Sequence, residues 1–145
     1  MNDQKERSDV AGLEALNPAR LEAANAAVAK LAVAYPSMVE TDMREIRATL
    51  AGGASDNPID MAGELRRFAH NFMGQGASFG YPLISAIAKS MHDYLHALDQ
   101  AAELRRDTVE GHLYAIDEVF DRRLTGDYGA EGAAILNRLA TLSAL

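Results

Sequence analysis

The chain has 145 residues, 48% of them hydrophobic and 24% charged, which is the composition of one globular domain with a core of its own. It contains no cysteine, so a disulfide scaffold, a thiolate nucleophile and a cysteine-based metal centre are excluded. The net charge of −7 argues against nucleic acid as a partner, because an acidic surface repels phosphate groups.

Residues 1–16 are mostly polar and charged, and we predict that they form a flexible N-terminal segment. They lack the apolar stretch of a signal peptide, and no apolar run in the chain approaches the ~18 residues that span a bilayer. We therefore expect a cytoplasmic protein without a membrane partner.

Two amphipathic segments separated by Pro36 are predicted next. The first covers residues 17–35 and opens on an Asn-Pro pair, which combines a helix cap with proline at the first helical position. The second begins at Ser37, where Glu40 completes a capping box, and it ends at Gly52-Gly53. Pro36 fits either a true helix end or a kink inside one long helix. The apolar residues expected to face a core are Leu21, Ala24, Val28, Leu31, Ala32, Met38, Met43, Ile46 and Leu50.

The rest of the chain continues with helical periodicity and no alternating, strand-like segment. We predict helices over residues 58–74, 82–98, 109–124 and 131–142. Because short loops join these amphipathic helices, neighbours should run antiparallel. Residues 17–145 are therefore expected to form an all-α domain, an antiparallel four-helix bundle with an additional terminal helix or helices.

One residue of the 58–74 segment lies on the wrong face for a core side chain. At about 100° per residue, His70 falls about 140° from Leu65, which is at the centre of the apolar stripe. Gly63, Gly74 and Ala77 lie within about 40° of His70, so almost no side chain stands beside it. Glycine inside a helix costs about 1 kcal/mol relative to alanine, so these bare positions suggest that something large approaches the imidazole.

Positive charge is predicted near the same imidazole. Arg66 and Arg67 lie one turn before His70, within about 60° of it on the helical wheel, where they could bind an anion. The plainer alternative is an exposed histidine without function, next to glycines that only mark the end of a helix. The wheel by itself leaves both interpretations open.

The stretch AHNFMGQGASFG, residues 69–80, resembles the signature of histidine-containing phosphotransfer (HPt) domains. That signature has Ala-His, an apolar residue two positions after the histidine, Lys-Gly at three and four positions after it, then small residues and a later glycine. The similarity covers roughly Leu31 to His96 and implies a four-helix bundle that carries a phosphoryl group on His70. The matching positions are Ala69, His70, Phe72, Met73, Gly74, Ala77, Ser78 and Gly80, followed by the apolar residues Ile84, Ile87 and Met91.

Two positions depart from the family pattern. The lysine usually found three residues after the histidine is Met73 here, and we expect Arg66 and Arg67 to supply the missing charge. On the next helix the family often has Gln or Glu placed to hydrogen-bond the active imidazole, and that position is His92. His92 lies on the edge that approaches His70, where it would orient the ring or accept a hydrogen bond from it. The alternative is an exposed His92 that contacts nothing.

The resemblance implies a stoichiometric phosphoryl carrier rather than a turnover enzyme. His70 would pass the group between a hybrid histidine kinase and a response-regulator receiver domain, and the receiver would bring Mg²⁺, so no cofactor is expected on this chain. We expect a monomer whose docking surface surrounds His70. The alternatives are an HPt-fold module that docks a receiver or kinase without transferring phosphate, and a plain helical scaffold or dimerisation domain. The docking surface is predicted to include Gly63, Met73, Gly74, Ala77, Tyr81 and Ser85.

The other histidines give weaker signals. His92 and His96 have the spacing of the zinc-binding HExxH motif, but Asp93 replaces its glutamate and the sequence shows no third ligand. We therefore predict no metal site and interpret the pair as solvated histidines. His112 lies at the border of an apolar face and is interpreted as a structural boundary residue.

Overall fold

The computed structural model describes residues 17–52, 58–100 and 103–144. The helices in these ranges are α2 (Pro18–Leu50), α3 (Pro58–Gly76), α4 (Pro82–Ala97), α5 (Arg106–Asp121) and α6 (Gly129–Ala144), with a 3₁₀ turn η1 (Ala77–Phe79) after α3. The same ranges contain no strand, so the all-α prediction is confirmed. The predicted flexible segment 1–16 lies outside the described residues.

The chain divides into two compact units, residues 1–35 and 36–145. The structure describes residues 17–35 of the first unit, of which residues 18–35 form the N-terminal half of α2. The side chain of Asn17 accepts a hydrogen bond of 2.8 Å from the backbone N–H of Arg20, so the predicted cap is confirmed. Leu21, Val28 and Leu31 are about half exposed, so the prediction that they face a core is wrong. The part of this unit that the structure describes is a single helical segment, which offers no second layer to bury them.

α2 continues through Pro36 without a break, so the second interpretation of that proline, one long helix, holds. The helix ends where predicted, because Gly52 adopts a φ of +82° and its N–H donates to the Thr49 carbonyl at 3.1 Å. Met38 was expected in the core but is exposed, and its neighbour Val39 is buried instead.

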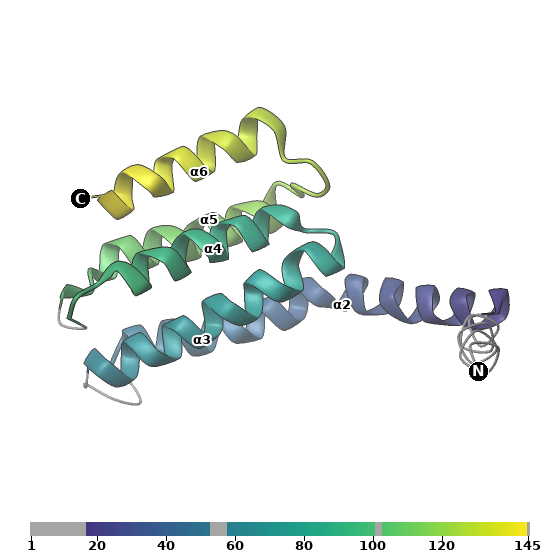
Figure 1. Ribbon diagram of the computed structural model, residues 1–145, viewed down its shortest axis with the longest axis horizontal. Helices are drawn as coiled ribbons and strands as arrows, with labels where there is room; N and C mark the ends of the chain where they lie inside the picture. Colours follow the sequence, from purple (N-terminus) through teal and green to yellow (C-terminus); the bar gives the residue numbers. More distant parts are fainter. Residues whose placement is uncertain (1–16, 53–57, 101–102, 145) are drawn as a thin grey trace, which may run out of the picture. The chain divides into compact units, whose positions relative to one another are not determined.

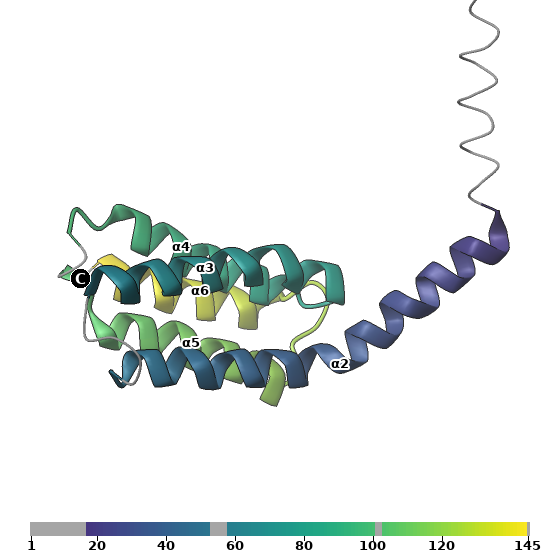
Figure 2. The same ribbon diagram turned by 90° about the horizontal axis from the view of Figure 1, so that it is seen from below.

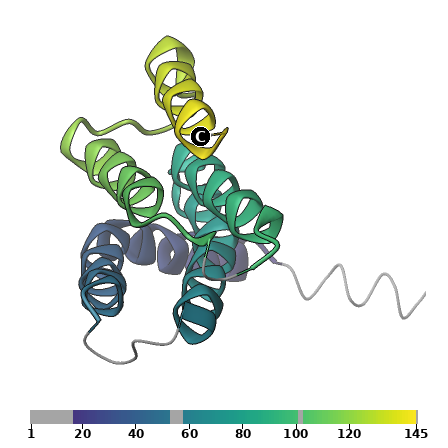
Figure 3. The ribbon, with the colours of Figure 1, turned by 90° about the vertical axis from the view of Figure 1, so that its left-hand side faces the viewer.

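The second unit is a bundle in which consecutive helices run antiparallel (Figure 1). Seen end-on, the C-terminal half of α2 together with α3, α4 and α5 occupies four corners, and α6 packs against α4 and α5 (Figure 3). α5 runs along the C-terminal half of α2 (Figure 2), where Arg47 and Asp117 form an ion pair of 2.5 Å. This arrangement is the predicted four-helix bundle with an additional terminal helix.

Apolar side chains from every helix of this unit fill its interior. Full burial of one such side chain contributes roughly 1.5–3 kcal/mol, which makes this core the main source of stability. Leu65 and Phe72 hold the inner face of α3 there and so fix which residues of α3 point outward. The largest fully buried side chains of the unit are Met43, Ile46, Leu65, Phe72, Leu83, Ile84, Ile87, Met91, Leu113, Ile116 and Ile135.

The start of α5 connects the ends of two other helices. Arg106 donates to the carbonyl of Leu50, the last residue of α2, and Arg105 donates at 2.9 Å to the carbonyl of Leu142 near the end of α6. These carbonyls have no partner within their own helices, and cations favour that end of a helix. α5 begins three residues before the predicted start because its first turn is polar and adds nothing to the apolar periodicity.

Candidate functional site

His70 lies on the exposed face of α3, opposite the buried stripe that contains Leu65 and Phe72. The exposure agrees with its predicted place on the helical wheel. Because the apolar stripe is fully occupied in the core, α3 cannot rotate to bury the imidazole without exposing those side chains. The fold therefore holds one histidine where a second protein can reach it.

The surface along α3 beside His70 is bare. Gly63 and Gly74 are exposed, and a Cβ added to either would meet no heavy atom within 4 Å. Ala77 in η1 is exposed as well. No packing contact accounts for glycine at the first two positions, so their effect is to leave room beside the imidazole, as the sequence predicted.

The turn after this surface is tied together by Ser85. Its hydroxyl accepts a hydrogen bond of 2.8 Å from the Ala77 N–H and donates one of 2.9 Å to the Met73 carbonyl. A Cβ on Gly76 would come within 2.8 Å of Ser85 and of the Tyr81 carbonyl, so this close approach requires glycine. Ser85, predicted as a docking residue, is partly buried and joins the end of α3 to the start of α4.

Tyr81, another predicted docking residue, is partly buried and packs on α5. Its ring centroid lies 4.9 Å from that of Phe120. Gly80, just before it, has a φ of +88°, which an L side chain rarely adopts, and its carbonyl accepts a hydrogen bond of 3.4 Å from the Gly126 N–H. These contacts fasten the α3–α4 turn to the end of α5.

Three histidines lie in a row on the α3–α4 surface, with His92 between His70 and His96. The ring centroids of His70 and His92 are 6.5 Å apart, and those of His92 and His96 are 4.3 Å apart. The Nε2 atoms of His92 and His96 are 3.1 Å apart and form a hydrogen bond. His92 is therefore near His70, as predicted, and the alternative that it contacts nothing is wrong. Its hydrogen-bond partner is His96, which the sequence analysis placed in solvent.

The charged side chains around this surface differ in their exposure and in whether they already have a partner. Arg66 is partly buried, and its Nε donates at 3.3 Å to the Ala62 carbonyl of its own helix, whereas Arg67 is exposed. Lys89, one turn before His92, pairs with Asp93 at 2.6 Å. That hydrogen bond is the main reason that the pKa of Asp93 is lowered. Lys89 was not among the predicted site residues, although its spacing from His92 puts both on one face of α4.

His112 of α5 is fully buried, deeper than the predicted boundary position. Its Nδ1 lies 2.8 Å from the Thr108 carbonyl, and its Nε2 lies 2.9 Å from the Ser90 hydroxyl. The carbonyl can only accept, so Nδ1 carries the proton and Nε2 accepts from the hydroxyl. Burial lowers the pKa of His112, and the hydrogen bond to Thr108 partly opposes that shift. Both ring nitrogens of His112 are therefore used in hydrogen bonds within the fold.

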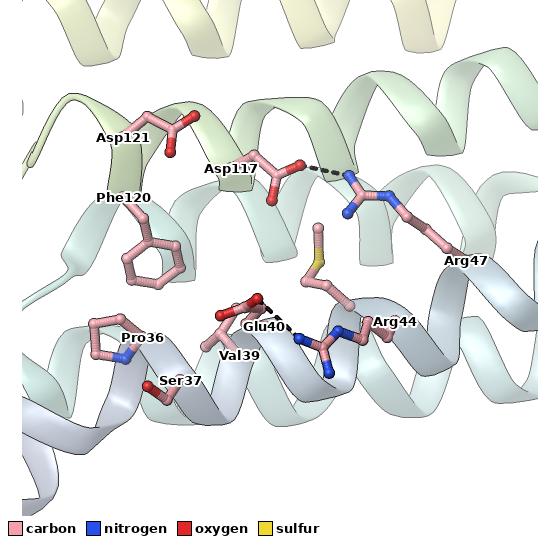
Figure 4. A pocket seen from close by; sticks show the side chains of 10 residues that line it. Pro36, Ser37, Val39, Glu40, Arg44, Arg47, Asp117, Phe120 and Asp121 are labelled. Carbon is pink, nitrogen blue, oxygen red and sulfur yellow. Dashed lines mark hydrogen bonds and ion pairs between the residues drawn. The ribbon is translucent and has the colours of Figure 1, made fainter.

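A cleft of about 490 Å³ lies between α2 and α5, away from the residues predicted to form the site (Figure 4). Two ion pairs line it, Glu40–Arg44 at 3.0 Å and Arg47–Asp117 at 2.5 Å. Because these charges already pair with one another, the cleft offers little to a charged ligand. The exposed histidine surface is therefore the better candidate.

Within the described ranges, no three histidine or acidic side chains come together as a metal centre, and no helix is long and apolar enough to cross a bilayer. No family model, curated protein or solved structure matches this chain. The function of the chain must therefore be inferred from the residues of the α3–α4 surface and from the short motif that they form.

Proposed function

We propose that this chain is a histidine phosphotransfer protein of the cytoplasm that carries a phosphoryl group on His70. It would act between a hybrid histidine kinase and response-regulator receiver domains, as a stoichiometric carrier. The observation that carries the proposal is the exposed imidazole of His70 on a bundle helix, between Gly63 and Gly74, which have no packing reason to be glycine.

The chemistry asks little of this chain beyond access to a nucleophile. A neutral imidazole attacks the phosphorus of an aspartyl phosphate with the lone pair of one ring nitrogen, while the other nitrogen keeps its proton. A nitrogen–phosphorus bond forms, the phosphorus–oxygen bond breaks, and the receiver regains a free carboxylate. The return step reverses this sequence. The partner would supply Mg²⁺, so no metal or nucleotide site is required near His70.

The surface around His70 suits a transient partner. The bare stretch along α3 lets another backbone approach the imidazole, and Arg67 offers an exposed positive charge one turn away. His92 lies close enough that a modest movement of its ring would bring it toward the phosphoryl oxygens of modified His70. Ser85 and Tyr81 hold the α3–α4 turn in place, and this turn follows the bare stretch of α3.

The proposal is tested first with phosphoramidate, a small donor that transfers its phosphoryl group to reactive histidines. The wild-type chain should gain one phosphoryl group that is labile in acid and stable in base, measured by intact mass and ³¹P NMR. His70→Gln should gain none, while His96→Gln, the matched exposed control on α4, should gain as much as wild type. Equal labelling of His70→Gln and wild type would refute the carrier function.

The second test uses a partner. Incubation with a phosphorylated receiver domain, or with an active hybrid kinase and ATP, should move the label to His70. Met73 replaces the usual lysine and Arg66 binds its own helix, which favours the second candidate, a module that docks without transfer. Binding of a receiver without movement of the label would select that module. No affinity for receivers or kinases would leave a helical scaffold.

A further inference from the structure

The strongest feature outside the proposed reaction is the pair formed by His92 and His96 on α4. They are four residues apart and therefore one helical turn apart on the same face. Their Nε2 atoms face each other at 3.1 Å, with the rings tilted by 57°. His96 is exposed and a quarter of the His92 side chain is exposed, so water reaches the pair.

This separation fits two imidazoles that share one metal ion. With metal–nitrogen bonds of about 2.05 Å, two nitrogens 3.1 Å apart subtend an angle of about 98° at the ion. That angle lies between the right angle of octahedral or square-planar ions and the tetrahedral angle of zinc. Without a metal, one of the two Nε2 atoms must carry a proton to form the hydrogen bond, and an ion would replace that proton.

The neighbouring charged groups, Lys89 and Asp93, balance each other and do not repel a cation at this place. The Asp93 carboxylate lies 3.9 Å from Nδ1 of His92, on the side where carboxylates hydrogen-bond to metal-bound histidines, although this distance is too long for such a bond. Lys89 is the nearby cation, and it is held by the other oxygen of the same carboxylate. Imidazole ligands suit Cu²⁺, Ni²⁺ and Zn²⁺ rather than Mg²⁺ or Ca²⁺, which prefer oxygen.

We propose that His92 and His96 bind one transition-metal ion of the Cu²⁺, Ni²⁺ and Zn²⁺ class through their two Nε2 atoms, with water completing its coordination. The proposal departs from our interpretation of the pair as solvated histidines, which was based on the missing third ligand. Two ligands make a weaker site than the three or four of catalytic and structural zinc centres. The inference does not depend on the phosphoryl-carrier proposal.

The test is calorimetric titration of the untagged full-length chain with Ni²⁺ alone. Wild type should bind one equivalent, and His70→Ala should bind with the same affinity because it keeps the pair. His92→Ala and His96→Ala should each weaken binding by roughly tenfold or more, since losing even an outer-shell partner of a metal costs that much. Thermal unfolding checks that every variant is folded.

A matched control keeps the number of histidines and changes only their spacing. The double variant His96→Ala, Ala97→His moves the second imidazole about 100° around α4, so its affinity should fall as far as that of His96→Ala. Undiminished binding by that variant or by His96→Ala would overturn the inference. An equal loss in His70→Ala would also overturn it, because the ion would then be bound by His70 as well.

Discussion

The four histidines of this protein occupy two opposite environments. His112 is fully buried between α4 and α5, where the Thr108 carbonyl and the Ser90 hydroxyl bind its two nitrogens. His70 and His96 are exposed on the α3–α4 surface and His92 is partly buried there, and the hydrogen bond of the His92–His96 pair engages one nitrogen of each of those two rings. Burial with both nitrogens satisfied makes an imidazole part of the fold, whereas exposure keeps it available for chemistry.

The largest expected difference is in stability. His112→Ala should lower the free energy of unfolding by about 2–4 kcal/mol, because it opens a cavity in the core and leaves the partly buried Ser90 hydroxyl without its partner. His70→Ala and His96→Ala should stay within about 0.5 kcal/mol of wild type. Urea unfolding followed by circular dichroism measures both. Similar losses at buried and exposed positions would contradict the comparison.

Two glycines of α3 give a second contrast. Gly76→Ala should cost about 1–3 kcal/mol, since its Cβ would come within 2.8 Å of backbone and side-chain atoms of α4 and the preceding turn. Gly74→Ala should be neutral or stabilising by up to about 1 kcal/mol, because its Cβ meets nothing and alanine favours helix. Thermal unfolding of the two variants checks the order. If Gly74→Ala also destabilises the fold, its position is not open.

The dependence of stability on pH should come in part from His112. Burial lowers its pKa from the ordinary value of 6.5, so on acidification the unfolded chain takes up the proton before the folded chain does. The stabilising effect of the neutral ring is thus complete above pH 6.5 and is lost as the pH falls below it, by at most about 1.4 kcal/mol per pH unit.

His112→Gln removes this titration while offering polar atoms in the same place. The measurement is the free energy of unfolding between pH 7 and pH 5 for the variant and for wild type. The variant should show the flatter profile whatever its absolute stability. An unchanged slope would mean that His112 takes up its proton without cost in the folded state.

The smallest effect is expected at Thr108, whose carbonyl binds His112. Its side chain is fully buried, and among the described residues its hydroxyl finds no hydrogen-bond partner. Thr108→Val keeps the shape and removes the unsatisfied group, so it should be neutral or stabilising by about 1 kcal/mol. Thermal unfolding with Thr108→Ala as the cavity-forming control separates the loss of the hydroxyl from the loss of volume.

The features of this fold that depend on neighbouring residues in the sequence could be predicted. The helical period placed His70 on the exposed face of α3, and the cap at Asn17 and the left-handed Gly52 mark ends of α2 that the sequence indicated. These features depend on residues within a turn or two of each other. The same period misplaced Met38, because the choice between Met38 and Val39 depends on which face of α2 meets the other helices.

The details of the site needed contacts across helices. The helical wheel placed His112 at the border of the apolar face of α5. In the structure Ser90 on α4 supplies the second hydrogen bond of the buried ring. The sequence indicated a surface residue at Ser85. In the structure α3 and α4 lie close enough for its hydroxyl to bridge them. The spacing of His92 and His96 was visible in the sequence, and only the rotamers of the two rings show that the nitrogens face each other.

The Ser85 bridge also bears on how the protein folds. It closes a hairpin of two helices in which His70 and His92 approach each other across one short turn, so the contacts that build this surface are local in sequence. Local contacts cost little loop entropy and form early in helical proteins. The α3–α4 hairpin therefore brings His70 and His92 together at a small cost in loop entropy.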